Sequence, residues 1–457
     1  GSGVLVDLLS GKATSIGGDL ENKLKNIKAV IGSGFNDELY GDNNDNIFTG
    51  GKGNDRLEGR SGNNTYVFFA GFGEDTVVDS SGKGTLDLGI ISEDLIADLM
   101  GSSATVGYGT NAVLFTGISL VKTGAGNDVF NISGTYTLNI ASGDGDDIFK
   151  FTDSGKVVGT LDAGEGTNTL DFTGYGNNVA INLADMKVSA GDQLILSKFA
   201  NIHKLIGSSH ADQNDTVTGP NRDARFSITG DNIGSISWTA AANPALTIIM
   251  LFEGIESLIG GSGNDIFAVI GSGKLSSTVD GGAGLNTLDY SGYNKGDGSG
   301  VVVDLLSGKA TSIGGFLDNI VKNIKAVIGS DYNDELSGDN NDNIITGGAG
   351  SDTMEGRGGY NTFVFLHGFG TGDAVTNSSG LGVLDLSAIT ENLTASIVPA
   401  FNTVGYGANQ VNFTGVSLIK TGAGNDTFNI SGTSDFNIEG GAGDDRFILA
   451  HRAKSKG

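Results

Sequence analysis

The sequence predicts an all-β protein that forms an elongated, right-handed parallel β-solenoid. Three observations support this fold class. Glycine-rich windows with one shared pattern recur along the 457 residues, the acidic residues in these windows are spaced at a near-constant interval, and apolar residues alternate with polar ones between the windows. A turn that repeats at a fixed interval, each time followed by a short alternating strand, is typical of coils stacked on one another.

The windows fit the pattern G-G-x-G-x-D-x-U-x, in which U is a large apolar residue and position 1 is sometimes Thr or Ser. Glycine at positions 2 and 4 permits backbone angles that other residues avoid, and it lets one turn lie directly against the next. Position 8 begins a strand and points its apolar side chain inward. The eight windows are 50–57, 123–130, 142–149, 260–267, 281–288, 347–354, 421–428 and 440–447.

The spacing of the acids defines the coil. Asp37 and Asp55 lie 18 residues apart, the length of two nonapeptides, whereas Asp45 and Asn64 lie 19 apart and would occupy the opposite edge. The same ladder recurs later in the chain, and further steps of 19–21 residues connect the other windows. These later members are Asp334, Asp342, Asp352 and Asn361; Asp128, Asp147 and Asn168; Asp265 and Asn286; and Asp426 and Asp445.

The segments between the turns alternate as strands do. After Asp128, Phe130 and Ile132 fall on one side of a predicted strand and Asn131 on the other. One coil later Phe149 occupies the place of Phe130, and Leu170 follows one coil further on. We therefore expect Phe130, Phe149 and Leu170 to form an inward-facing ladder.

The sequence also contains repeats that are much longer than one coil. Residues 1–150 and 298–447 align almost throughout, and the middle block is a shortened relative of both. We expect three repeats, 1–160, 161–297 and 298–457, in one continuous solenoid, because each coil buries its faces only against its neighbours. The chain starts and stops within a repeat and has no initiator methionine, so we expect a segment of a longer repetitive protein.

The nonapeptide resembles the calcium-binding repeat of the RTX (repeats-in-toxin), or hemolysin-type, proteins. The resemblance implies a β-roll solenoid with several Ca²⁺ ions bound between stacked turns by carboxylates and turn carbonyls, all oxygen ligands. It also implies type I secretion and folding on contact with external calcium. The residues expected to bind metal are Asp37, Asp45, Asp55, Asp128, Asp147, Asp265, Asp334, Asp342, Asp352, Asp426 and Asp445.

Some turns depart from the family pattern. Asparagine replaces the position-6 acid at Asn64, Asn168, Asn286 and Asn361, so we expect weaker calcium binding there or none. Three extra residues precede Asp215, which leaves its role as a ligand open. The alternative interpretation is a set of glycine-rich turns without metal, which the recurrence of the acid at one offset disfavours.

The composition agrees with an extracellular protein. The formal net charge is −26, from 53 Asp and Glu against 27 Lys and Arg, and closely spaced carboxylates repel one another without cations. There are no cysteines, so calcium is the expected substitute for disulfides. So acidic a surface disfavours nucleic acid as a partner. No apolar run reaches the length of a membrane-spanning helix.

The sequence contains no recognisable catalytic motif. His203, His210, His367 and His451 are scattered, and neither a His-Glu-x-x-His helix nor a Gly-x-Ser-x-Gly elbow occurs. We therefore expect a structural protein rather than an enzyme: a segment of a secreted or surface fibre, stalk, adhesin or layer, with possible end-to-end self-association. The alternative is an export and folding module of a secreted toxin or enzyme.

Overall fold

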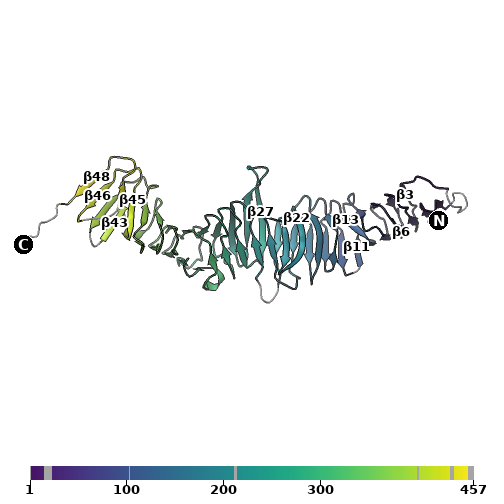
Figure 1. Cartoon of the computed structure of the whole chain (residues 1–457), viewed down its shortest axis with the longest axis horizontal. Coiled ribbons are helices and arrows are strands. Elements are labelled where there is room, and N and C mark those ends of the chain that lie inside the picture. The colour runs from purple at the N-terminus through teal and green to yellow at the C-terminus, as the bar shows by residue number, and fades with distance from the viewer. Residues whose placement is uncertain are drawn as a thin grey trace, which may run out of the picture. The chain divides into compact units, whose positions relative to one another are not determined.

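Strands dominate the computed structural model of the chain (Figure 1), which describes residues 2–14, 23–101, 103–209, 214–398, 401–432 and 437–450. The single helical element among these residues is a short 3-10 helix, η2 (Gly314–Phe316). None of the described residues forms a helix long and apolar enough to cross a membrane. The prediction of an all-β protein is confirmed.

The chain divides into two compact units. The first contains residues 1–216 and 250–254, and the second contains 217–249 and 255–457. Two strands, β24 (Thr216–Thr218) and β27 (Thr247–Glu253), have residues in both units. This division groups residues by proximity and not by sequence similarity, so the repeat boundaries at 161 and 298 stay predictions.

Short strands make up the first unit, most of them three to five residues long. They are β1 (Leu5–Asp7), β2 (Lys12–Ala13), β3 (Ala29–Ile31), β4 (Glu38–Tyr40), β5 (Ile47–Thr49), β6 (Arg56–Glu58), β7 (Thr65–Val67), β8 (Glu74–Val78), β9 (Gly84–Asp87), β10 (Ile96–Met100), β11 (Ser103–Tyr108), β12 (Asn111–Thr116), β13 (Ile118–Lys122), β14 (Val129–Ile132), β15 (Thr135–Tyr136), β16 (Asn139–Ala141), β17 (Ile148–Phe151), β18 (Lys156–Asp162), β19 (Thr169–Asp171), β20 (Ala180–Asn182), β21 (Lys187–Ala190), β22 (Gln193–Ala200) and β23 (Lys204–Ile206).

The second unit is built from strands of the same kind. They are β25 (Ala224–Gly230), β26 (Ile233–Thr239), β28 (Ser257–Ile259), β29 (Ile266–Val269), β30 (Val279–Asp280), β31 (Thr287–Asp289), β32 (Val302–Asp304), β33 (Lys309–Ala310), β34 (Val321–Lys322), β35 (Ala326–Ile328), β36 (Glu335–Ser337), β37 (Ile344–Thr346), β38 (Thr353–Glu355), β39 (Thr362–Val364), β40 (Thr371–Thr376), β41 (Gly382–Asp385), β42 (Thr394–Val398), β43 (Phe401–Tyr406), β44 (Asn409–Thr414), β45 (Val416–Lys420), β46 (Thr427–Ile430), β47 (Asn437–Glu439) and β48 (Arg446–Leu449).

Parallel pairing between every second strand organises the glycine-turn regions. In the first unit β3, β5, β7 and β9 pair in one sheet, and β4, β6 and β8 pair in another. In the second unit β35, β37, β39 and β41 pair in the same way beside β36, β38 and β40. Successive strands therefore alternate between two sheets, and each turn connects one sheet to the other.

Apolar side chains in register fill the space inside the turns. Phe130 pairs with Phe149 and Phe149 with Leu170 along β14, β17 and β19, and all three are fully buried. The rings of Phe130 and Phe149 stack with their centroids 5.0 Å apart. The predicted inward ladder is confirmed, and stacked aromatic pairs of this kind add to the stabilisation from buried area.

Antiparallel strands interrupt the parallel sheets, which the expectation of a wholly parallel solenoid did not include. In the first unit β11 runs antiparallel between β10 and β12, which pair in parallel with β14 and β8. In the second unit β43 lies in the same way between β42 and β44. The reversals follow two-residue turns whose glycines, Gly109 and Gly407, have φ of 57° and 56°, as hairpin turns require.

Candidate metal centre in the stacked glycine turns

The glycines at positions 2 and 4 stack each turn on the one before it. In the turn 50–55, Gly51 and Gly53 have φ of 111° and 124°, which L side chains rarely adopt. A Cβ on Gly51 would lie 2.0 Å from the carbonyl oxygen of Ser33, and one on Gly53 would lie 2.6 Å from the carbonyl carbon of Phe35. Both glycines are therefore required by backbone angle and by close approach.

The same contact recurs in turn after turn. A Cβ on Gly143 would lie 2.1 Å from the carbonyl oxygen of Gly124, and one on Gly145 would lie 2.3 Å from that of Gly126. Each glycine therefore lies against the carbonyl of its counterpart one coil earlier, so backbone carbonyl oxygens lie at the contact between neighbouring turns. Carbonyl oxygens are ligands that Ca²⁺ accepts.

The position-6 aspartates connect successive turns through one carboxylate oxygen. Oδ1 of each accepts the backbone N–H of the position-6 residue, or its equivalent, one coil earlier. Asp55 accepts from Asp37 at 2.8 Å, and Asp147 accepts from Asp128 at 2.8 Å. We call this set the acid ladder. Its members are Asp37, Asp55, Asp75, Asp128, Asp147, Asp215, Asp265, Asp334, Asp352, Asp373, Asp426 and Asp445.

The second carboxylate oxygen of many of these residues is buried without a hydrogen-bond partner. Asp55 is 2 % exposed and Asp147 is fully buried, yet Oδ2 of each has no partner. A buried polar atom left unpaired costs free energy, and more so when it carries charge. The ladder residues with an unpartnered Oδ2 are Asp55, Asp75, Asp128, Asp147, Asp352, Asp373 and Asp426.

Burial raises the pKa of six of these carboxyl groups, those of Asp55, Asp75, Asp128, Asp147, Asp352 and Asp373. The pKa of Asp55 rises to about 6, and those of Asp147 and Asp352 rise to about 7. Removal from water is the largest cause, and the charge of the neighbouring ladder aspartate adds to it. The protein itself therefore leaves negative charge uncompensated along the ladder, and a bound cation would offset that charge.

Four ladder aspartates, Asp37, Asp215, Asp265 and Asp334, satisfy Oδ2 within their own turn. Oδ2 of Asp334 accepts the N–H of Ser330 at 2.6 Å, and Oδ2 of Asp265 accepts that of Gly261 at 2.9 Å. Oδ2 of Asp37 accepts the N–H of Ser33 in the same way. An N–H donor does not neutralise a carboxylate, so these turns also keep a negative charge that a cation could offset.

Asparagine turns provide an internal comparison. Oδ1 of Asn168 accepts the N–H of Asp147 at 2.8 Å, as a ladder carboxylate would. Its Nδ2 then donates to the carbonyl oxygen of Ala163 at 2.8 Å and to that of Asn201 at 3.1 Å. The ladder aspartates have an unpartnered Oδ2 at this place, whereas Asn168 has the Nδ2 group, which donates to backbone carbonyl oxygens.

Two of the predicted metal ligands lie elsewhere. Asp45 and Asp342 are exposed, and their Oδ1 atoms accept the backbone N–H groups of Asn63 and Tyr360, each at 2.7 Å. The buried position-6 residue of these turns is the next one, Asn46 or Asn343. The predicted register was off by one residue, because Asp and Asn are adjacent and the buried strand residue that fixes the register lies two positions after the asparagine.

Two ladder members were missed from the sequence. Asp75 and Asp373 are 3 % and 1 % exposed, and their Oδ1 atoms accept the N–H groups of Asp55 and Asp352. The turn before Asp75 keeps glycine at positions 2 and 4, Gly71 and Gly73, with Ala70 at position 1, whereas the turn before Asp373 has Phe369 at position 2 and Thr371 at position 4. The signal that could have identified them is the spacing, 20 residues after Asp55 and 21 after Asp352.

Asp215 and Asp445 join the ladder at its margins. Oδ1 of Asp215 accepts the N–H of Val179 at 2.6 Å, so the extra residues before it, 210–213 of which lie outside the described residues, do not displace it. Oδ1 of Asp445 accepts the N–H of Asp426 at 3.0 Å, although Asp445 is only half-buried.

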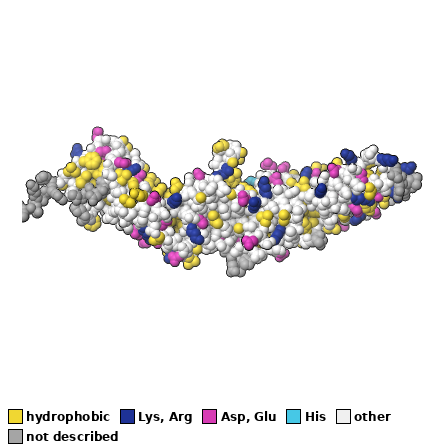
Figure 2. Space-filling view, viewed as in Figure 1, with side chains coloured by type: hydrophobic (Ala, Val, Ile, Leu, Met, Phe, Trp, Pro, Cys, Tyr) yellow, Lys and Arg dark blue, Asp and Glu magenta, His cyan; other side chains and the backbone are white. Residues whose placement is uncertain are grey.

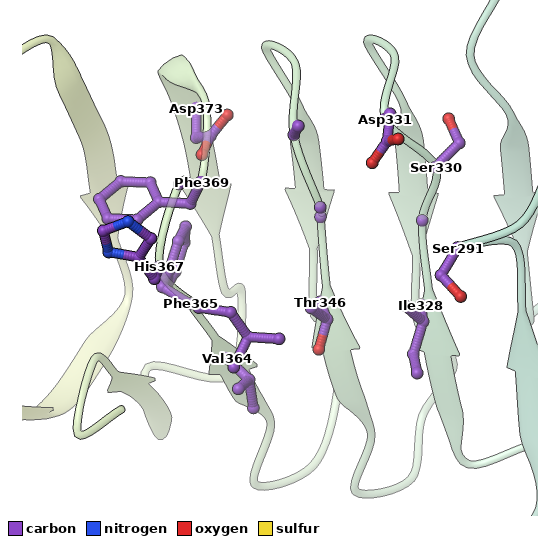
Figure 3. Close-up of a pocket in the computed structure, with 16 residues that line it drawn as sticks. Ser291, Ile328, Ser330, Asp331, Thr346, Val364, Phe365, His367, Phe369 and Asp373 are labelled. Carbon is purple, nitrogen blue, oxygen red and sulfur yellow. The ribbon is translucent and has the colours of Figure 1, made fainter. Parts of the chain in front are cut away.

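Figure 2 shows acidic and basic side chains interspersed on the visible face, without one dominant patch. A cavity of about 240 Å³ opens beside the acid turns of the second unit (Figure 3), with Asp331 and Asp373 near the turns and Ile328 and Thr346 on the strands. Its exposed lining is mainly apolar, so it offers a cation less than the turns themselves do.

The two histidines in the described part of the chain, His203 and His367, do not form a common site. His367 is exposed, with Nδ1 2.8 Å from Oε1 of Glu391, and Nδ1 of His203 lies 3.4 Å from the backbone nitrogen of Asn168. His210 and His451 lie outside the described residues. In the described part of the chain, no three His, Asp or Glu side chains form a metal-binding group. A cation at the ladder would therefore need backbone carbonyls to complete its shell.

Comparison with known proteins agrees with this geometry. Residues 31–66, 252–268 and 328–363 match the family described as RTX calcium-binding nonapeptide repeat (4 copies). These segments contain Asp37, Asp55, Asp265, Asp334 and Asp352 of the acid ladder. No curated protein matches the chain significantly.

Proposed function

Since the chain is an RTX-type calcium-binding repeat protein, we propose that calcium ions bind along the acid ladder and stiffen a structural segment. The proposal covers Asp37, Asp55, Asp128, Asp147, Asp265, Asp334, Asp352, Asp426 and Asp445, and extends to Asp75 and Asp373. It leaves out Asp45 and Asp342, because their exposed carboxylates already hold the next turn. The observation that carries it is the buried, unpartnered Oδ2 that recurs at one offset.

In each acid turn, the two carboxylate oxygens and the glycines have different roles. Oδ1 of the ladder aspartate fixes the register of neighbouring coils, and Oδ2 supplies negative charge inside the turn. The glycines allow the backbone of each turn to lie directly against the carbonyl groups of the turn one coil earlier. Calcium, when bound, supplies the positive charge that the low-dielectric interior of the turn lacks. Binding is thereby coupled to folding, because the ligands come together only when the coils stack.

We further propose that the coils form a right-handed β-solenoid of the β-roll type with a mechanical role, as a segment of a secreted or cell-surface fibre, stalk, adhesin or layer. Support comes from the two long repeats, which build the same arrangement twice: β10, β11 and β12 in one, and β42, β43 and β44 in the other. Type I secretion and an extracellular location, where calcium is abundant, belong to the same proposal.

The second candidate is an export and folding module of a secreted toxin or enzyme. The same calcium-coupled folding favours it, since a chain that stays unfolded at low calcium is suited to secretion and folds outside the cell. A catalytic domain in the full-length protein would favour this candidate. Tandem continuation of the repeat would favour the structural one.

Far-UV circular dichroism with and without chelator tests the calcium dependence. We expect the β signal to fall strongly in chelator and to return in millimolar Ca²⁺, with weaker recovery in Mg²⁺, which requires a smaller octahedral shell. A β signal that chelator does not change would contradict the proposal.

Sedimentation velocity in calcium then separates the two candidates. Growth of large species with increasing protein concentration would support end-to-end self-association and the structural role. A strict monomer at high concentration would favour the export module.

A further inference from the structure

Six turns carry asparagine at position 6. In four of them, at Asn64, Asn168, Asn286 and Asn361, the asparagine holds the neighbouring coil as the acids do, and we call these four the amide turns. In the other two, Oδ1 of Asn46 or Asn343 accepts the position-2 N–H of its own turn, and Nδ2 is buried without a hydrogen-bond partner. Oδ1 of Asn64 accepts the N–H of Asn46 at 2.9 Å, and Oδ1 of Asn286 accepts that of Asp265 at 3.0 Å. Asn168 and Asn361 make the equivalent bonds, so the side chain occupies the same place in both classes of turn.

The amide nitrogen of each of these residues donates to the oxygens around it. Nδ2 of Asn361 donates to the carbonyl oxygens of Gly356 at 2.9 Å and Gly358 at 2.6 Å, which are positions 1 and 3 of its own turn. It also donates to Oδ1 of Asn377 on the following coil, at 2.8 Å. One NH₂ group thus donates hydrogen bonds to oxygens of two coils, the same kind of oxygens that a cation between those coils would bind.

The other amide turns repeat this arrangement. Nδ2 of Asn286 donates to the position-3 carbonyl of Ala283 at 3.2 Å and to the carbonyl of Asn323 on the next coil at 3.1 Å. Nδ2 of Asn64 donates to Ser61 at 3.1 Å and to Oδ2 of Asp79 at 2.9 Å. An aspartate in the same rotamer would direct a negative oxygen at these same acceptors, which repel it.

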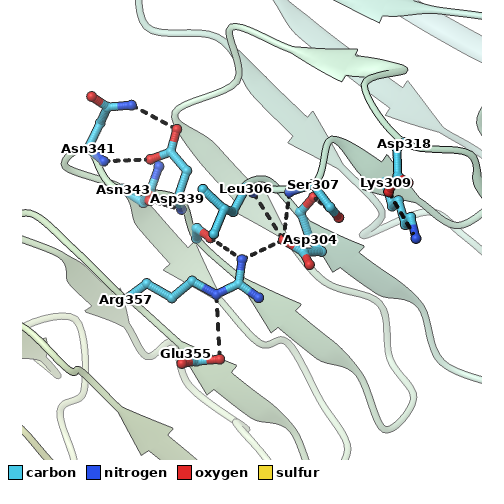
Figure 4. Close-up of polar contacts among 11 residues, drawn as sticks. Asp304, Leu306, Ser307, Lys309, Asp318, Asp339, Asn341, Asn343, Glu355 and Arg357 are labelled. Atoms are coloured by element: carbon cyan, nitrogen blue, oxygen red, sulfur yellow. Dashed lines mark hydrogen bonds and ion pairs between the residues drawn. The ribbon is translucent and has the colours of Figure 1, made fainter.

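Two amide turns carry an additional positive group. Arg357, at position 2 of its turn, has φ of 58°, a conformation unfavourable for an L side chain. Its Nη1 donates to Oδ1 of Asp304 at 2.5 Å and to the carbonyl oxygen of Gly338 at 3.0 Å (Figure 4). Arg60 makes the same two bonds in the first unit, to Asp7 and Gly41. The guanidinium joins three successive turns and brings a positive charge to a position-1 carbonyl.

From these contacts we infer that the amide turns form without a cation: the NH₂ group of the position-6 asparagine takes the place that calcium takes in the acid turns. The inference rests on the proposed calcium binding of the acid ladder. It distinguishes two classes of turn, the acid turns, closed by calcium, and the four amide turns, closed by their own side chains; the turns at Asn46 and Asn343 belong to neither class. Removal of calcium should release the first class while the second keeps its hydrogen bonds.

Isosteric exchanges in the full chain test this inference. Asp147→Asn should lower the number of bound calcium ions by about one per chain, measured by equilibrium dialysis, because the new amide donates where the ion would bind. Asp146→Asn is the matched control. Asp146 is adjacent but exposed, and its Oδ1 accepts the N–H of Thr167 at 2.6 Å, a bond that asparagine can keep. The control should bind as much calcium as the wild type.

Asn168→Asp provides the reverse test, which does not depend on the first variant folding. It should make the turn at 163–168 sensitive to chelator, so that the amide hydrogen of Asp147, which bonds to Asn168 Oδ1, exchanges faster in chelator than it does in the wild type. Unchanged calcium content in Asp147→Asn, or unchanged exchange in Asn168→Asp, would overturn the inference while calcium binding by the wild type stands. A wild-type chain that binds no calcium would instead overturn the proposed function.

Discussion

Replacing Gly51 with alanine tests the close stacking of turns. The backbone there has φ of 111°, and the new methyl group would lie 2.0 Å from the carbonyl oxygen of Ser33. A side chain in so sparsely populated a conformation costs about 1–3 kcal/mol. Displacing the packed neighbour costs about 1–3 kcal/mol more. We therefore expect a loss of roughly 2–6 kcal/mol in the free energy of unfolding of this region.

Gly34→Ala is the matched control, because a Cβ on Gly34 meets nothing within 4 Å. Alanine in a compatible conformation restricts the unfolded chain and should stabilise by about 0.4–1 kcal/mol. Urea unfolding in saturating calcium, followed by circular dichroism, would measure both variants, and a calcium titration would show whether the displaced turn also binds more weakly. Equal unfolding midpoints for Gly51→Ala and Gly34→Ala would refute the stacking argument.

Three further predictions concern the core, an ion pair and the ladder. Phe149→Ala removes a fully buried ring that stacks on Phe130, and should cost about 3–5 kcal/mol in urea unfolding, whereas Lys150→Ala on the outward side should cost little. Burial alone would raise the pKa of Asp304, but its hydrogen bonds to Arg357 and Ser307 outweigh that effect and hold the pKa at about 2, below its usual 3.8. This depressed pKa contributes stability above pH 3.8 that is lost as the pH falls through 2, about 1–2 kcal/mol after allowance for solvent screening. Arg357→Gln should return the Asp304 pKa measured by NMR titration toward 3.8, and an unmoved pKa would contradict the role of the arginine. Asp75→Asn should lower the calcium content, and unchanged content would exclude Asp75 from the ladder's metal positions.

Local patterns in the sequence predicted the repeated features of this fold. The glycines and the acid at fixed offsets identified Asp55 and Asp147, and alternation identified Phe130 and Phe149 as inward residues. Each of these inferences needs only one coil and its period. Because every coil repeats the same contacts with its neighbours, a period found in the sequence carries over directly to the structure.

Features that depart from the nonapeptide pattern or from the coil spacing could not be predicted in this way. At Asp45 the register could not be read because Asp and Asn are adjacent, and Asp373 was missed because its turn lacks glycine at positions 2 and 4. The antiparallel strand β11 depends on a two-residue hairpin turn at Gly109 that the nonapeptide pattern does not describe. The Arg357–Asp304 pair joins residues 53 apart, which no period near 20 connects.

Crystallography of the chain grown in calcium tests the central claim most directly. We predict ions between the stacked turns, within about 2.3–2.6 Å of Oδ2 of Asp55, Asp147 and Asp352, each with about six to eight oxygen ligands that include turn carbonyls. The amide turns at Asn168 and Asn361 should hold no ion. A well-resolved structure in saturating calcium, with the same strands and with the acid turns free of ions, would contradict the account.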